Sequence, residues 1–135
     1  MLHTTYDRSQ IFVGDNRYET GTYTNGTGST KDLAKGTLMG RIHATGKLTP
    51  LASAASDGSQ YPVGILADDY SVLDTASATV TICVAGDVVS SKIVLDGSDT
   101  LETVISARRI KDRIGADTVG IKLVATDELT GYDNA

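Results

Sequence analysis

The residues that could carry out metal or nucleophilic chemistry are few in this sequence. His3 and His43 are its two histidines and Cys83 is its one cysteine, and their spacing does not match a zinc motif. Cys83 has no base beside it in sequence, and it lies in an alternating apolar run typical of a buried strand. Catalysis would require His43, Cys83 and a carboxylate to meet in the fold. We therefore expect no enzyme, and no catalytic, metal or cofactor site.

Other charged and glycine-rich groups also lack the pattern of a reactive site. Asp68 and Asp69 would point to opposite faces of a strand, so they do not form an acid–base pair by themselves. Residues 21–28 are rich in glycine, but no strand-to-helix phosphate cradle follows them. The run from Leu101 to Ile114 is basic, and we interpret it as a solvated helix face that carries Arg108, Arg109, Lys111 and Arg113.

Length and charge limit the classes of protein that fit. The chain has 135 residues, enough for one domain, with a formal net charge of -5 and a pI near 4.8. This acidic balance disfavours nucleic acid as a partner, because phosphate contacts depend on clustered Lys and Arg. No apolar run approaches the roughly 20 residues that span a bilayer, and the first ten residues do not resemble a signal peptide. We expect a soluble, unexported protein without a membrane partner.

The elements that would position any site are mainly short strands. Residues 37–43 are predicted to pair with residues 47–51 across a tight turn that contains Gly46. Residues 79–84 alternate cleanly, with Val80, Ile82 and Val84 on one face. Further strands are expected at 63–67, 88–89, 93–95 and 120–124, with a turn or bulge at Gly86 and Asp87. The sequence predicts a mainly β domain.

One helix is expected between Asp99 and Gly115. Asp99 could cap the first-turn amides while Glu102, three residues on, reaches back, and Gly115 could end the helix. Leu101, Val104 and Ile105 share a face but the later isoleucines do not, so the helix should be short or break near Arg108.

The N-terminal residues 1–32 differ from the single β-rich domain expected at 33–135. Thr20–Thr30 consists almost wholly of Gly, Thr, Ser and Asn, which predicts a flexible arm. Yet four aromatic residues, Tyr6, Phe12, Tyr18 and Tyr23, lie in the first 23 positions, and Ile11, Phe12 and Val13 form an apolar triplet. Two interpretations remain open: the triplet packs on its own domain, or it docks onto a partner.

The stretch Tyr61–Asp69 carries the clearest structural signature. Gly64 lies inside an apolar run, which predicts a bulge or a close backbone approach, and Pro62 predicts that the run begins at a sheet edge or rim. Together with Gly36–Ile42, Ala44–Pro50, Asp57–Gln60 and the alternating strand 79–84, this stretch resembles the head decoration proteins of tailed bacteriophages, of the lambda type.

This resemblance, which covers roughly residues 35–95, implies a function. It implies a β-clip-like domain that forms a homotrimer on the outer surface of an expanded phage capsid, made in the host cytoplasm and acting as cement. The partner would be the major capsid protein, against which the N-terminal arm orders by strand-like pairing, and three arms per trimer would make weak contacts avid. By composition, the capsid-binding residues of the arm would be Tyr6, Ile11, Phe12, Val13, Tyr18 and Tyr23.

A second hypothesis is a β-rich receptor-binding or carbohydrate-binding module on a virion or cell surface. In such a module the aromatic residues would line a shallow site instead of an arm. Binding of glycans by an arm-deleted variant would favour this alternative.

Overall fold

The fold is mainly β, as the sequence predicts. A computed structural model describes residues 11–95, 97–118 and 120–124, apart from the side chains at 13 and 14. Within these ranges the elements are β1 (Phe12–Thr24), β2 (Lys31–Leu33), β3 (Leu38–Arg41), β4 (Leu48–Pro50), β5 (Pro62–Leu66), β6 (Tyr70–Val72), β7 (Ser77–Val89), the 3-10 turn η1 (Ser90–Lys92), β8 (Val104–Ile105), β9 (Arg108–Arg109), α1 (Ile110–Asp117) and β10 (Gly120–Val124).

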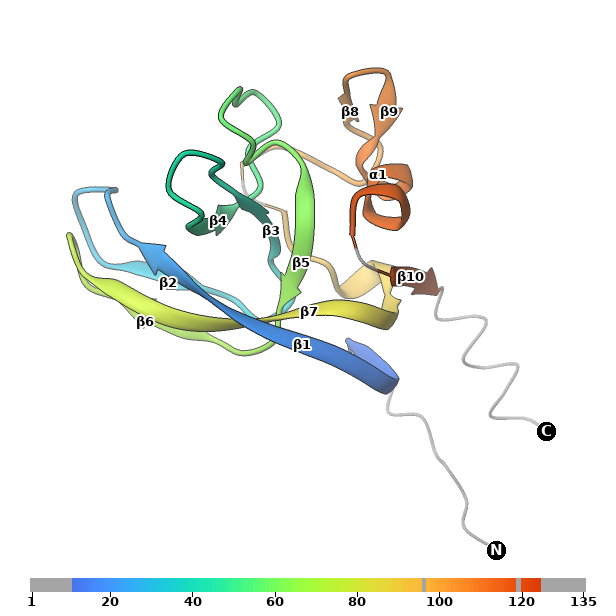
Figure 1. Ribbon diagram of the computed structural model, residues 1–135, viewed down its shortest axis with the longest axis horizontal. Coiled ribbons are helices and arrows are strands. Elements are labelled where there is room, and N and C mark those ends of the chain that lie inside the picture. The colour runs from blue at the N-terminus through green and yellow to red at the C-terminus, as the bar shows by residue number, and fades with distance from the viewer. Residues whose placement is uncertain (1–10, 96, 119, 125–135) are drawn as a thin grey trace, which may run out of the picture.

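One sheet organises the molecule, with β7 as its central strand. The strand order is β1-β7-β5-β3-β4, with antiparallel neighbours, and β10 pairs in parallel with β7. Two short pairs, β2–β6 and β8–β9, lie outside this sheet. In Figure 1, β1 and β7 run along the lower side, while β3, β4 and β5 lie above them and α1 lies beside β8 and β9.

The alternation of β7 explains why the sheet has a core on each face. Val80, Ile82 and Val84 pack in one cluster with Tyr23 and residues of β3 to β6. Cys83, on the opposite face, packs in a second cluster with Ile110 and Ile114 of α1. The predicted strand 79–84 is confirmed and extends to 77–89.

The predicted hairpin and the predicted role of Gly64 are confirmed. β3 pairs with β4 across a turn in which Gly46 has a φ of 72°. A Cβ at Gly64 would lie 2.8 Å from the carbonyl oxygen of Cys83, and the β3–β5 register shifts beside it, between Met39 and Gly40. Pro62 opens β5, which is an inner strand of the sheet rather than an edge strand.

The prediction of a helix from Asp99 to Gly115 is wrong at both ends. Val104–Ile105 and Arg108–Arg109 form the β8–β9 hairpin, and α1 runs from Ile110 to Asp117, with Gly115 inside it. Asp99 instead accepts a hydrogen bond from the hydroxyl of Ser53 at 2.7 Å. The expected capping group is therefore engaged by a distant loop.

Within the described residues, the segment predicted as a flexible arm over residues 1–32 contains two strands. Residues 12–24 form β1, which pairs with β7 along almost its whole length, and residues 31–33 form β2, which pairs with β6. A turn or bulge is predicted at Gly86 and Asp87. β7 continues through these residues, and the irregularity lies in the pairing opposite Gly86, where residues 14–16 bulge out of β1. Pairing with distant strands thus orders a described segment whose composition suggests disorder.

Candidate functional site

The expected capsid-binding residues occupy three different environments. Ile11 and Tyr23 are buried, at 9% and 4% exposure, in the two separate cores. Phe12 is half-buried, whereas Tyr18 is 45% exposed on β1. Tyr6 lies outside the described residues, and for Val13 only the pairing of its main chain with Asp87 is described. Among the described residues of the predicted set, Tyr18 is the most exposed aromatic residue.

Ile11 and Phe12 of the apolar triplet pack against the core of their own domain, which is what the first of the two interpretations expects. The Val89 amide donates to the carbonyl of Ile11 at 2.8 Å, and Phe12 lies opposite Val88. The Phe12 ring contacts the Tyr18 ring edge to face, with centroids 5.9 Å apart. We call Ile11–Val13 the N-terminal clip, because main-chain pairing holds it on the sheet and Ile11 and Phe12 also pack against the core.

A bulge separates this clip from the rest of β1. Asn16 donates from its side-chain amide to the carbonyl of Asp87 at 3.0 Å and lies 3.4 Å from the Cys83 sulfur. Gly86 faces it with a φ of 116°, and a Cβ there would lie 2.9 Å from the Asn16 Cα. A glycine is needed at this point both for its conformation and for the space it leaves. The clip is therefore a short unit that the bulge joins to the rest of β1.

The outer edge of β1 is the longest strand edge at the end of the sheet order. Among the described strands β1 pairs only with β7. Unpaired main-chain groups on such an edge can pair with an incoming strand. Arg17 and Glu19 are exposed on this strand, and charged residues of this kind discourage uncontrolled edge-to-edge association. The arrangement suits controlled strand addition better than catalysis.

The residues considered for catalysis do not meet. Cys83 is fully buried in the core, and its thiol donates to the carbonyl of Ala85. His43 is exposed and lies over Gly58, at a shallow hollow that also includes Tyr61, Pro62, Val63, Arg113 and Asp117. Among the described residues no group of His, Cys, Asp and Glu side chains could hold a metal ion. The His43–Cys83 site that catalysis would need is not assembled.

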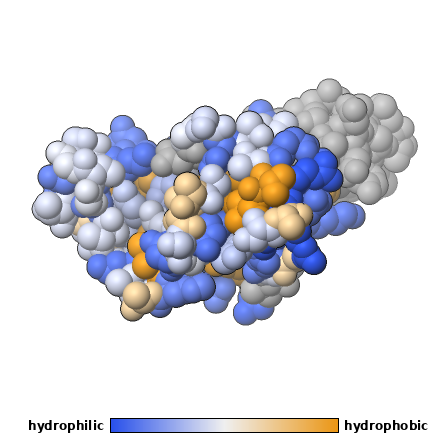
Figure 2. All heavy atoms as spheres, turned by 90° about the horizontal axis from the view of Figure 1, so that it is seen from above, coloured by the Kyte–Doolittle hydropathy of each residue, from blue (hydrophilic) through white to orange (hydrophobic). Residues whose placement is uncertain are grey.

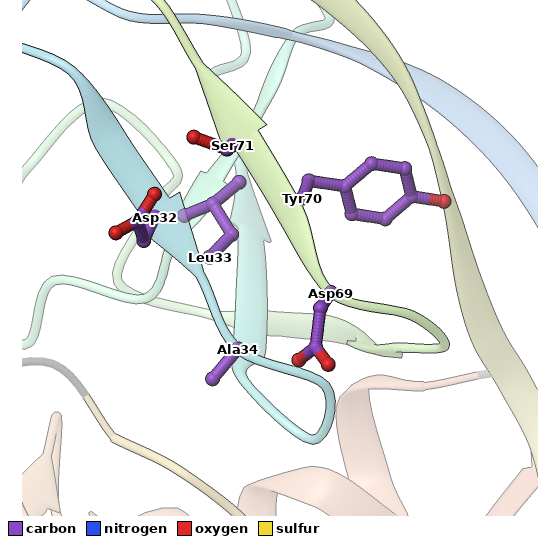
Figure 3. A pocket seen from close by; sticks show the side chains of 6 residues that line it. All are labelled: Asp32, Leu33, Ala34, Asp69, Tyr70 and Ser71. Carbon is purple, nitrogen blue, oxygen red and sulfur yellow. The ribbon is translucent and has the colours of Figure 1, made fainter.

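A second shallow hollow lies where β2 meets β6. It is lined by Asp32, Leu33, Ala34, Asp69, Tyr70 and Ser71 (Figure 3). Asp69 accepts a hydrogen bond from the Lys35 amide at 2.7 Å, and the Tyr70 hydroxyl accepts one from the Thr81 amide at 2.9 Å. Asp69 thus fixes the loop before β6 to the residues that follow β2, and Tyr70 fixes β6 to β7. Asp68 and Asp69 are loop acids, as the sequence indicates.

The basic run behaves differently from the solvated helix face that its sequence suggests. Arg113 is buried, donates to the carbonyls of Ile105 and Ser106 at 2.6 and 3.0 Å, and lies over the Tyr61 ring. Glu102 pairs with Arg109 and Lys111 at 3.1 and 2.8 Å, which lowers the pKa of the Glu102 carboxyl, chiefly through its hydrogen bond to Lys111. The positive charges are therefore largely matched within the hairpin–helix unit.

The surface is mostly hydrophilic in the view from above. Figure 2 shows one larger group of hydrophobic side chains near the middle of this face and smaller hydrophobic spots elsewhere. Val104 of β8 is 61% exposed. A single exposed aliphatic residue of this kind is ordinary on a protein surface. Within the described ranges, no helix has the length and apolar character needed to cross a bilayer.

Comparison with known proteins gives this geometry a context. No curated protein matches the chain. The family model of the bacteriophage lambda head decoration protein D matches residues 5–109. The match covers β1 and β2, which the resemblance seen in the sequence did not include, and it ends at the last residue of β9, before α1. Because the match covers most of the chain, the protein belongs to the lambda head decoration protein D family, a family of structural proteins of the phage head.

Proposed function

We propose that the protein is a trimeric cement protein that binds the major capsid protein on the outer surface of a tailed-phage head and stabilises the expanded capsid. The family match over residues 5–109 carries this proposal. The net charge of -5 is consistent with a location away from the packaged DNA.

The structure suggests which parts of the N-terminal region would act. Tyr23 and Ile11 stabilise the cores, so a head-binding role falls to groups that remain accessible. Among the described residues these are the exposed ring of Tyr18 and the outer edge of β1. To them we add Tyr6 and the other residues that precede the clip, which lie outside the described residues. An extended capsid segment could pair with that edge through main-chain hydrogen bonds. Three copies in one trimer would multiply individually weak contacts.

The test must respect the role of β1 in the fold. Removal of residues 1–30 would delete the strand that pairs with β7, so loss of binding would only report unfolding. We therefore choose removal of residues 1–10, and a second variant in which a Gly/Ser sequence of equal length replaces them. Light scattering gives the mass, and co-sedimentation with expanded heads gives binding.

We expect both variants to remain trimers and to lose most of their head binding. A monomeric full-length protein would contradict the trimer, and unchanged binding by both variants would contradict the role of the N-terminal residues. Stabilisation is measured separately, as the temperature at which heads release their DNA with and without added protein. An unchanged release temperature would contradict the cement function even if the protein binds.

A further inference from the structure

The turn between β1 and β2 contains an asparagine that is followed by glycine. Asn25 comes directly after β1, and Asn25–Gly26 is the one Asn–Gly pair in the sequence. Asn25 is fully buried, whereas Gly26 is exposed. This turn lies beside the turn between β6 and β7, at one end of the molecule (Figure 1). We call residues 25–30 and 73–76 the tip.

Hydrogen bonds fix the Asn25 side chain in one orientation. Its amino group donates to the carbonyls of Ser29 and Val72, at 2.7 and 2.8 Å. Its carbonyl oxygen accepts from the amide and the hydroxyl of Thr27, at 3.0 and 2.7 Å. The main chain of Asn25 also pairs in both directions with the β6–β7 turn, at 2.9 Å each. The buried amide is therefore satisfied on both sides while the tip is closed.

An Asn–Gly pair is able to modify itself. The main-chain nitrogen of the glycine attacks the side-chain carbonyl carbon of the asparagine, a C–N bond forms, and ammonia leaves. Water then opens the resulting succinimide at either of its two carbonyls, which gives aspartate or isoaspartate. Water is the only co-reactant. Glycine favours the attack because it has no side chain to hinder the approach of its nitrogen.

The closed tip prevents this attack. Ring closure requires the side-chain carbonyl carbon of Asn25 to turn toward the nitrogen of Gly26. That rotation would separate the amide from Ser29, Val72 and Thr27 and would leave buried polar groups without partners. Such a state is reached only by local opening of the turn. The reaction rate in the folded protein is therefore set by the fraction of time for which the tip is open.

We propose that Asn25–Gly26 is a self-modification site that is blocked in the closed tip and reacts when the tip opens. The products cannot restore the closed tip. A carboxylate has no N–H group for the carbonyls of Ser29 and Val72, and it would place a charge where Asn25 is fully buried. Isoaspartate also lengthens the main chain by one carbon. An opening that is followed by reaction is thus permanent, and the tip acts as a one-way switch.

An exposed contact controls how often the tip opens. The Gly28 amide donates to the Asp74 carboxylate at 3.0 Å, which joins the two turns of the tip. Asp74 is exposed and does not contact the Asn25 side chain through any of the hydrogen bonds above. Its removal should therefore change the opening of the tip without changing the chemistry of the Asn–Gly pair.

The first test compares the full-length protein in native buffer with the same protein in denaturing urea, both at mildly alkaline pH. Peptide mass spectrometry follows conversion of the Asn25 amide to the acid, and enzymatic methylation detects isoaspartate. We expect the reaction to be at least about a hundredfold slower in the folded protein, because breaking several buried hydrogen bonds makes the open tip rare. Equal rates under the two conditions, or no reaction at Asn25 in urea, would overturn the proposal.

Two variants separate the chemistry from the opening. Gly26→Ala should keep the fold, since no atom lies within 4 Å of the new Cβ, but it should slow the reaction in urea by about tenfold or more, because the methyl group hinders the nitrogen. Asp74→Ala should speed the reaction in the folded protein by about threefold to fivefold, for one lost hydrogen bond, and should leave the rate in urea unchanged. A wild-type rate for Gly26→Ala in urea would refute the site. A wild-type rate for Asp74→Ala in the folded protein would refute control by opening.

Asn25→Asp tests whether the change is permanent, because it contains one of the two products. Amide hydrogen exchange in this variant should be faster at residues 27–33 and 70–76, while residues 79–83 of β7 keep their protection. Protection of the tip equal to that of the wild type would refute the one-way switch. The rate measurements above do not depend on the stability of this variant.

Discussion

Gly64 offers a direct test of how tightly the central strands approach each other. In Gly64→Ala the new Cβ would lie 2.7 Å from the Ile82 Cδ1 and 2.8 Å from the carbonyl oxygen of Cys83. Non-bonded heavy atoms pack at about 3.5–4.0 Å, so one strand must move. β5 is paired with β3 on one side and with β7 on the other, and this double pairing limits the movement.

The expected loss of stability follows from two opposing effects. Overpacking costs about 1–3 kcal/mol, and we expect the upper end because the Cys83 carbonyl belongs to the backbone of the central strand. Alanine also restricts the unfolded chain, which offsets about 0.4–1 kcal/mol. The net decrease in the free energy of unfolding should be about 2 kcal/mol, or a decrease in Tm of roughly 5–8 °C for a domain of this size.

Urea unfolding and calorimetry would measure this change. Gly26→Ala is the matched control, since no atom lies within 4 Å of its new Cβ, and it should be as stable as the wild type or slightly more stable. Ile82→Val, which removes the Cδ1 atom, should restore part of the stability of Gly64→Ala in a double-mutant cycle. Equal stability of Gly64→Ala and Gly26→Ala would refute the reasoning, and complete rescue would show that the Cys83 carbonyl contributes nothing.

Three further substitutions test other contacts. Arg113→Met should lower the free energy of unfolding by about 2–3 kcal/mol and speed amide hydrogen exchange in β8–β9, because it leaves the Ile105 and Ser106 carbonyls without their donor. Exchange rates in the hairpin that equal those of the wild type would contradict this. Asn25→Ala should cost about 2–3 kcal/mol in urea unfolding, since this fully buried amide bonds the carbonyls of Ser29 and Val72, and a loss under 0.5 kcal/mol would contradict it. Hydrogen bonds from the Ser59 hydroxyl and, to a smaller extent, from the Ser59 amide hold the pKa of Asp57 below its ordinary value. Asp57 therefore stabilises the fold at pH values above its ordinary pKa, and this contribution disappears as the pH falls through the lowered pKa. NMR titration should find the Asp57 pKa raised in Ser59→Ala, and an unchanged pKa would exclude the hydroxyl as its cause.

Local sequence was sufficient wherever the structure depends on nearby residues. The alternation of Val80, Ile82 and Val84 follows directly from the pleat of a strand. Gly46 indicates a tight turn between two segments that pair with each other. Gly64 was identified because a missing side chain inside an apolar run has few structural explanations. These features required no knowledge of distant residues.

The helix was misplaced because a distant residue engages its expected capping residue and a turn interrupts its middle. Asp99 is bonded to Ser53, 46 residues earlier, and Arg113 holds the carbonyls of Ile105 and Ser106. Ser106 and Ala107 adopt positive φ values of 49° and 71°, which are rare outside glycine and end any continuous helix there. Helical periodicity between Leu101 and Ile105 could not reveal these contacts.

The sequence by itself determined the mainly β character, the turns and the resemblance to head decoration proteins, because alternation, glycine positions and motif order are local properties. Only the tertiary structure determined whether the Thr- and Gly-rich part of the N-terminal segment is ordered. Residues 18–24 pair with residues 77–83, more than fifty positions later, and this partner supplies the hydrogen bonds and packing that the Thr- and Gly-rich segment cannot provide alone. The same pairing turns alternating threonines, which suggested a flexible arm, into one ordered face.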